Sequence, residues 1–270
     1  RNYLSLIKFS HTIFAMPFAL IGFFLGIASL PTSVVPGWHT PIWLPGGING
    51  LLTILVLVIL CIVFARRAAM AFNRYLDRSF DAKNPRTAIR EIPAGILKAN
   101  SVLWFTIACS ILFVVCTWFI NPLCFYLSPI ALFVVLFYSY TKRFTPLCHL
   151  VLGLGLSLAP IGAYIAVTGR FDLLAILFSL AVIFWVSGFD IIYALQDEEF
   201  DRSLRLHSVS AWLGKKKALL VSRILHLLSI SSVVAAGFAL PFLWLYWTGV
   251  FIFTGMIIYQ HSIVKPHDLR

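Results

Sequence analysis

Charged side chains are scarce in this chain of 270 residues. Only 11% of the residues are Asp, Glu, Lys or Arg, whereas 60% are hydrophobic and the mean hydropathy is +0.94. Soluble domains carry about 25% charged residues, so this composition excludes a large soluble domain. A membrane-crossing helix needs about 20 apolar residues, which leaves room for at most about nine such helices with their loops. The composition therefore predicts an all-α polytopic membrane protein.

Cysteine patterns that indicate covalent or metal cross-links are also missing. The five cysteines form no Cys-x-x-Cys pair, and four of them lie inside apolar runs, where a thiol behaves as a small hydrophobic side chain. We therefore expect neither a disulfide nor a zinc site. The first apolar stretch contains no Ala-x-Ala cleavage pattern, so we expect it to be a retained span rather than a signal peptide.

Apolar runs separated by Pro, Gly and Asn predict about eight transmembrane helices. Each run is close to the length of about 20 residues that the hydrocarbon core requires. The expected spans are residues 9–30, 48–72, 99–119, 122–141, 147–168, 173–195, 216–239 and 241–260.

The basic residues fall almost entirely on one side of this arrangement. With eight spans the loops alternate between two sides, and 20 of the 21 Lys and Arg residues lie on one side, Arg170 being the exception. Because cytoplasmic loops are rich in Lys and Arg, we expect a multi-pass protein of the cytoplasmic (inner) membrane with both termini in the cytoplasm. Topology also explains the net charge of +11, so no nucleic-acid partner is expected.

Eight of the ten acidic residues lie in two short windows, one at the end of the second expected span and one at the end of the sixth. Asp77 and Asp81 in the first window are matched by Asp197 and Asp201 in the second, each 120 residues later. This offset indicates an internal repeat. It predicts one transmembrane domain, 1–270, with four-helix halves at about 1–145 and 146–270.

On a helix, both windows would align their oxygen-bearing side chains in one stripe. The two stripes comprise Asn73, Asp77 and Asp81, then Asp190, Asp197 and Asp201. Carboxylates without His or Cys partners suit Mg²⁺, which binds one or two carboxylates together with substrate phosphates. We therefore expect these six residues to be metal ligands and the five aspartates to be catalytic. The alternative is solvated salt bridges to the basic loops, each worth about 0 to 1 kcal/mol.

Basic and aromatic residues near the stripes are candidates for binding an anionic substrate. Lys142 is the sharpest of them, because it follows Tyr138 and Tyr140 at the end of the fourth expected span. Each basic residue is also explained, individually, as a topology determinant. The substrate-binding candidates are Arg67, Asn73, Arg86, Tyr138, Lys142, Arg143 and Tyr193.

Three segments resemble signatures of the UbiA superfamily of intramembrane prenyltransferases. Residues 73–90, NRYLDRSFDAKNPRTAIR, are similar to the first signature of the branch that prenylates 4-hydroxybenzoate and related quinone precursors. Residues 190–202, DIIYALQDEEFDR, are similar to the second, and 138–143 resemble the loop between the fourth and fifth helices.

The resemblance implies an aromatic prenyltransferase of ubiquinone or menaquinone biosynthesis, embedded in membrane lipid. In such an enzyme the six stripe residues hold two Mg²⁺ ions on a polyprenyl diphosphate, and basic residues such as Arg67 and Lys142 contact the phosphates. Ionisation then gives an allyl cation, which the ring carbon of an aromatic acid attacks.

The acceptor stays open between 4-hydroxybenzoate and a dihydroxynaphthoate. Enzymes that use 4-hydroxybenzoate commonly continue with an Arg-Pro pair after the first signature, whereas Arg90 is followed here by Glu91. The segment from Ile7 to Phe18 looks more like the subgroup that acts on a dihydroxynaphthoate in the futalosine route to menaquinone.

Other function classes share some of these features. A transporter also carries intramembrane carboxylates and repeats, but its sites usually lie near the membrane midplane rather than at span ends. A CDP-alcohol phosphotransferase requires an Asp-Gly-x2-Ala-Arg motif, which the sequence lacks. A prenyltransferase of the same fold with a haem or glycerol-phosphate lipid acceptor is a further alternative.

Overall fold

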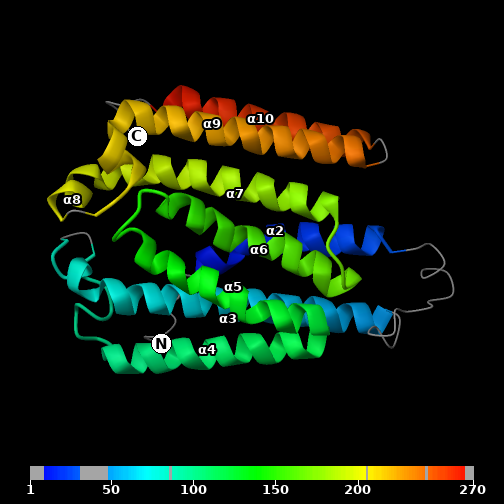
Figure 1. The fold of residues 1–270 in the computed structure, drawn as a ribbon, viewed down its shortest axis with the longest axis horizontal. Coiled ribbons are helices and arrows are strands. Elements are labelled where there is room, and N and C mark those ends of the chain that lie inside the picture. Colours follow the sequence, from blue (N-terminus) through cyan, green and yellow to red (C-terminus); the bar gives the residue numbers. More distant parts are fainter. Residues whose placement is uncertain (1–8, 31–47, 85–86, 205, 241–242, 265–270) are drawn as a thin grey trace. The chain divides into compact units, whose positions relative to one another are not determined.

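The computed structural model describes residues 9–30, 48–84, 87–204, 206–240 and 243–264. Within these ranges the chain forms helices and no strand (Figure 1). The all-α class predicted from composition is therefore confirmed.

Eight long helices correspond in position to the eight expected spans. They are α2 (Phe9–Ala28), α3 (Ile48–Asp81), α4 (Ala99–Ile120), α5 (Pro122–Thr141), α6 (Cys148–Thr168), α7 (Leu173–Ala194), α9 (Val209–Ala239) and α10 (Trp244–Ile263). By length and composition six of them, α3 to α7 and α9, are suited to cross a membrane. The helices α2 and α10 are not among these six, so the predicted number of eight spans is approximate. These six apolar helices are those of an integral membrane protein.

Two helices extend beyond their expected ends. Helix α3 continues past residue 72 to Asp81 and so carries the first acidic window. Helix α9 begins at Val209 rather than at residue 216, and it is kinked at Gly214, whose φ of 76° is readily adopted only by glycine. The apolar pattern ends where the charged residues begin, but the helix continues, because its backbone hydrogen bonds do not require apolar side chains.

The chain forms two compact units. The first comprises Arg1–Ser139 and Leu158–Phe171, and the second comprises Tyr140–Ser157 and Asp172–Arg270. In the first unit, α2, α3 and the end of α6 bury a core of small and branched side chains around Phe23, Val58 and Val167. Gly22 of α2 faces Pro160 of α6 so closely that a Cβ at position 22 would collide with the Pro160 carbonyl oxygen. Small residues at such contacts let membrane helices approach each other.

In the second unit, α7 lies beside α9, and α10 lies beside α9 (Figure 1). Serines join the first pair, since Ser222 Oγ donates to the Gly188 carbonyl at 2.8 Å and Ser229 Oγ donates to the Ala181 carbonyl at 2.8 Å. Hydrogen bonds of this kind hold helices together in lipid, where apolar burial gives little driving force.

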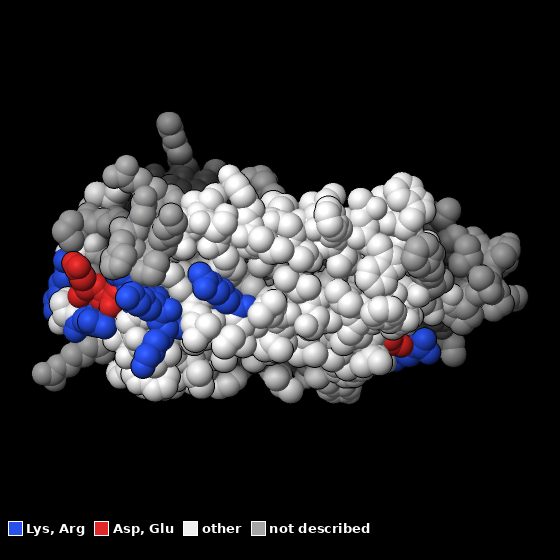
Figure 2. Space-filling view, turned by 90° about the horizontal axis from the view of Figure 1, so that it is seen from above, with Lys and Arg blue, Asp and Glu red and all other residues white. Residues whose placement is uncertain are grey.

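Most of the charged side chains on the face seen in Figure 2 lie toward one end, a few lie at the other, and a broad uncharged surface remains between them. This distribution is expected when the helices cross the hydrocarbon region and only their ends reach water.

Candidate active site

The first acidic stripe lies on one helix, as the sequence predicted. Asn73, Asp77 and Asp81 occupy the last turns of α3. Asn73 Nδ2 donates to Asp77 Oδ2 at 3.0 Å, which is the contact expected for side chains four residues apart on a helix.

Asp81 is buried and is held by the segment that follows α3. Only 6% of the residue is exposed, and its Oδ1 accepts a hydrogen bond from Arg90 Nη1 at 2.7 Å. Thr87 Oγ1 donates to the Asp81 backbone carbonyl at 3.1 Å. The other carboxylate oxygen, Oδ2, is buried and has no hydrogen-bond partner among the described residues. Arg86, a predicted substrate-binding residue in this segment, lies outside the described residues.

The second stripe differs from the single helical stripe that the spacing predicted. Helix α7 ends at Ala194, a short 3₁₀ helix η2 (Leu195–Asp197) follows, and helix α8 (Glu198–Ser203) carries Asp201. Ser210 Oγ donates to the Ala194 carbonyl at 3.3 Å, at the position where α7 gives way to the tighter turn. Asp190, Asp197 and Asp201 therefore lie on three consecutive elements.

Asp201 is completely buried beside a lysine. Its side chain is 0% exposed, and Lys142 Nζ lies 2.7 Å from its Oδ1. The contact is an ion pair, and neither carboxylate oxygen of Asp201 has a hydrogen-bond partner among the described residues. The backbone of Lys142 is also fixed, because its carbonyl accepts from the His207 N–H at 2.8 Å.

Asp190 has a partner that sequence reasoning did not find. Its side chain is 25% exposed, and Oδ2 lies 2.7 Å from Nδ1 of His149, which is buried near the start of α6. No local spacing relates these residues, and a histidine at the edge of an apolar run gives no indication of its partner. Arg90, the partner of Asp81, lies nine residues after it and beyond the end of α3, so helical spacing does not relate the two.

The substrate-binding candidates have varied surroundings. Arg67 Nε is buried without a hydrogen-bond partner among the described residues, as are Arg66 Nε and Arg74 Nη1 on the same helix. The guanidinium of Arg143 lies over the Tyr140 ring, 5.4 Å from its centroid, at a distance typical of a cation–π contact. Tyr138 is half-buried on α5. Buried guanidinium nitrogens suit an anionic ligand.

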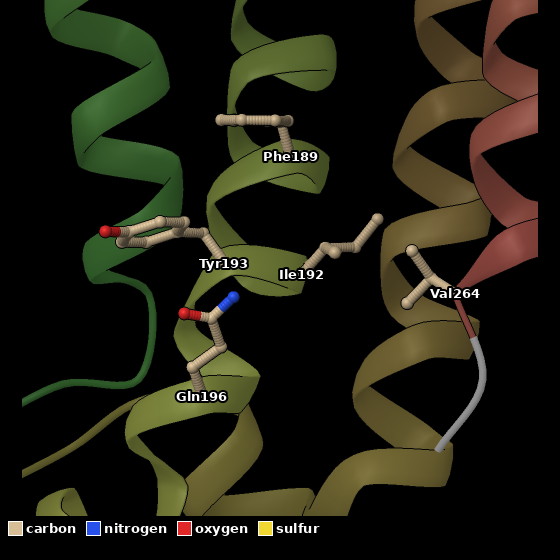
Figure 3. A pocket seen from close by; sticks show the side chains of 5 residues that line it. All are labelled: Phe189, Ile192, Tyr193, Gln196 and Val264. Atoms are coloured by element: carbon tan, nitrogen blue, oxygen red, sulfur yellow. The ribbon is translucent and has the colours of Figure 1, made fainter. Parts of the chain in front are cut away.

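Tyr193 lines a pocket of about 180 Å³ at the end of α7 (Figure 3). Phe189, Ile192 and Gln196 project from the same stretch of chain, and Val264 lies opposite them, just after α10. The lining is apolar apart from the Tyr193 hydroxyl and the Gln196 amide.

The oxygen donors have the chemistry that Mg²⁺ prefers. In the described part of either unit, no group of three or more His, Cys, Asp or Glu side chains is arranged to hold a metal ion by itself. However, Asp81 and Asp201 each bury a carboxylate oxygen that lacks a hydrogen-bond partner there, and such groups are rare unless an ion or water completes them. The residues present therefore fit a hard, oxygen-binding cation that a substrate phosphate helps to ligate.

The described cysteines are all free thiols. None belongs to a group of three or more metal-ligating side chains in the described ranges.

Comparison with known proteins identifies one matching family and several similar relatives. Residues 15–270 match the UbiA prenyltransferase family. A 4-hydroxybenzoate octaprenyltransferase from Alcanivorax borkumensis is 31% identical over 233 residues, which are 86% of this chain and 80% of that protein. One from Tolumonas auensis is 31% identical over 212 residues, covering 78% of this chain and 74% of the relative.

Solved structures share the fold. The apo structure of a UbiA homolog from Aeropyrum pernix K1 superposes with a TM-score of 0.80 at 29% identity, covering 94% of this chain and 88% of that one. A UbiA homolog from Archaeoglobus fulgidus bound to DMAPP and Mg²⁺ gives 0.75 at 19% identity, covering 97% and 87%.

Proposed function

This chain belongs to the UbiA prenyltransferase family and is an aromatic prenyltransferase, and from that premise we propose that it couples a polyprenyl diphosphate to an aromatic acid with the help of Mg²⁺. The observation that carries the proposal is the pair of buried carboxylates at Asp81 and Asp201. They stand 120 residues apart in the sequence, and each leaves at least one buried carboxylate oxygen without a hydrogen-bond partner among the described residues. Family membership also favours an enzyme over the transporter that the sequence alone left open.

The acidic residues of both windows would hold the cation on the diphosphate. We assign this role to Asn73, Asp77, Asp81, Asp190, Asp197 and Asp201, and we expect two ions, one for each window. When bound, Mg²⁺ neutralises the charge that develops on the diphosphate as it leaves. The guanidinium of Arg67 and the ammonium of Lys142 would donate to phosphate oxygens that the cations leave uncovered, and Arg86 and Arg143 are further candidates for this role.

The apolar helices would protect the reactive cation. Cleavage of the C–O bond of the prenyl diphosphate releases diphosphate and leaves an allyl cation, which water would capture in an open site. Attack by the ring carbon forms the new C–C bond, and loss of the ring proton restores aromaticity. A site enclosed by lipid-embedded helices excludes water from this sequence of steps. The rings of Tyr138 and Tyr193 are candidates for stabilising the cation through their faces.

Two acceptors fit the proposal. Relatives named 4-hydroxybenzoate octaprenyltransferase favour 4-hydroxybenzoate. The Glu91 that follows Arg90 and the segment from Ile7 to Phe18 favour a dihydroxynaphthoate, although Ile7 and Lys8 and the side chains of residues 9–13 lie outside the described part of the chain. We propose that the acceptor is one of these two aromatic acids, and the coupling experiment distinguishes between them.

Substrate coupling tests the proposal directly. Purified protein in detergent is incubated with Mg²⁺, a polyprenyl diphosphate and either 4-hydroxybenzoate or a dihydroxynaphthoate, and products are identified by mass spectrometry. We expect a product whose mass equals the acceptor plus the prenyl group minus one hydrogen, formed with one acceptor and abolished by EDTA. Turnover that persists after removal of divalent cations would contradict the metal site, and release of diphosphate without coupling to either acid would contradict the aromatic acceptor.

A further inference from the structure

His149 is buried against the second acidic window. The residue is 3% exposed, and its Nδ1 lies 2.7 Å from Asp190 Oδ2. On the other side of the ring, the backbone N–H of Val209 points to Nε2 at 3.4 Å. A carboxylate accepts hydrogen bonds, so Nδ1 carries the proton of this contact and donates it to Asp190 Oδ2.

The backbone around His149 is fixed to the helix that carries Asp190. Ser187 of α7 donates from Oγ to the His149 carbonyl at 3.0 Å, and Ser187 lies one helical turn before Asp190. Gly153, one turn after His149, packs so closely on α7 that a Cβ there would collide with Ser187 Oγ. The imidazole and the carboxylate are thus held at a defined separation by contacts between α6 and α7 about one turn from their hydrogen bond.

The nature of the partner separates Asp190 from the other two paired aspartates. Arg90 and Lys142 place a full positive charge beside Asp81 and Asp201. Asp190 is instead paired with an imidazole, whose Nδ1–H is directed at one carboxylate oxygen and so orients the group.

We infer that His149 is a positioning residue for Asp190: its Nδ1–H fixes one carboxylate oxygen so that the other is directed at a Mg²⁺ bound with the diphosphate. This inference rests on the proposed function, in which Asp190 is a metal ligand. Residues that orient a metal ligand by a hydrogen bond typically change metal affinity or activity by about 10- to 100-fold when they are removed. His149 would act through Asp190 and would not itself touch substrate.

The test measures metal binding as well as turnover, with Mn²⁺ in place of Mg²⁺ and inorganic pyrophosphate in place of the substrate. Binding of Mn²⁺ to the full chain in detergent is followed by electron paramagnetic resonance. We expect His149→Leu to weaken Mn²⁺ binding by about 10-fold or more. His149→Asn should restore most of the affinity, because the amide nitrogen of Asn occupies nearly the place of Nδ1 and also donates. His226→Leu, which removes another buried imidazole of the same unit, serves as the control and should leave Mn²⁺ binding unchanged.

The double variant decides whether His149 acts through Asp190. In an Asp190→Asn background, His149→Leu should weaken Mn²⁺ binding by no more than about twofold further, because the group it positions is already lost. An equal effect in both backgrounds, or a lower melting temperature with normal Mn²⁺ binding, would overturn the inference and make His149 a packing residue. Should His149→Leu fail to fold, His149→Met, which also lacks a donor, replaces it in the same comparison.

Failure of this inference and failure of the proposed function give different results. If Asp190→Asn alone leaves both Mn²⁺ binding and turnover unchanged, Asp190 is not a metal ligand and the proposed site is wrong at that position. If Asp190→Asn weakens both while His149→Leu changes neither, the proposed site stands and only the role of His149 is overturned.

Discussion

Lys142 places its ammonium nitrogen 2.7 Å from the buried Oδ1 of Asp201. The lysine side chain is 40% exposed, whereas the aspartate side chain is 0% exposed, so the pair joins a partly hydrated cation to a completely desolvated anion. A buried carboxylate without compensation is costly, and the lysine supplies that compensation in the absence of metal. We propose that the same nitrogen contacts a substrate phosphate once a metal ion is bound at Asp201, which is the role that the sequence predicts for Lys142.

Replacement of Lys142 should affect stability and substrate binding in different conditions. We expect Lys142→Ala to lower the stability of the metal-free protein by about 2 kcal/mol, less than for a fully buried pair because the lysine is partly exposed. Mg²⁺ with pyrophosphate should recover much of this loss, because the cation replaces the missing positive charge. The KM for prenyl diphosphate should rise while the acceptor KM stays nearly constant.

Thermal unfolding with EDTA or with Mg²⁺ and pyrophosphate measures the first effect, and steady-state kinetics measures the second. Lys216→Ala, an exposed basic residue of α9, is the matched control. A change confined to the acceptor KM would place Lys142 at the other substrate.

Asp77 and Asp197 should be equally necessary for turnover. Because they correspond in the two windows, each is expected to ligate a cation that stabilises the leaving diphosphate by several kcal/mol. Asp77→Ala and Asp197→Ala should each lose nearly all activity in the coupling assay. Glu199→Ala, an exposed acidic residue of α8, is the control and should keep its activity. A folded variant of either aspartate with turnover near that of the wild type would show that the two-window site is wrong.

Local sequence pattern was sufficient for the helices and for the first stripe. Apolar runs located each long helix because lipid imposes one length and one polarity on every span. The spacing of Asn73, Asp77 and Asp81 gave their common face because α3 is regular to its last residue. Both inferences depend only on residues near each other in the chain.

The rest depends on contacts between distant residues. The break in the second stripe occurs where Ser210 bonds to the Ala194 carbonyl, and no pattern around Asp197 contains that information. The partner of Asp190 likewise comes from another helix, at His149. Hydrogen bonds of this kind are set by how helices pack. The spacing of Asp190, Asp197 and Asp201 therefore fits one continuous helix, and nothing in the local sequence indicates that α7 ends at Ala194.

The orientation in the membrane is a further prediction from the sequence. Nearly all Lys and Arg lie on one side, so the loop that contains Arg86 should be cytoplasmic and the loop at Arg170 should face the opposite side. Single cysteines introduced at the exposed residues Lys83 and Arg170, after the natural cysteines are replaced, report the two sides. A membrane-impermeant thiol reagent added to intact cells should label position 170 and spare position 83. Labelling of position 83 would reverse the topology.

Packing at Gly22 gives a stability prediction that is independent of the chemistry. A Cβ at this position would collide with the Pro160 carbonyl oxygen, and backbone cannot rotate away as a flexible side chain can. Gly22→Ala should therefore push α2 from α6 and destabilise the first unit by about 1 to 3 kcal/mol, as overpacking of a core usually does. Any gain in helix propensity, at most about 1 kcal/mol, would be smaller than this loss.

Gly162 on α6 is the matched control for Gly22. No atom lies within 4 Å of a Cβ built there, so Gly162→Ala introduces the same methyl group into open space. We expect this variant to unfold at the wild-type temperature or slightly above it, since alanine favours the helix, while Gly22→Ala unfolds several degrees below it. Thermal unfolding of both purified variants in one detergent provides the comparison. Equal melting temperatures would mean that α2 and α6 do not pack as closely in the membrane protein as the structure places them.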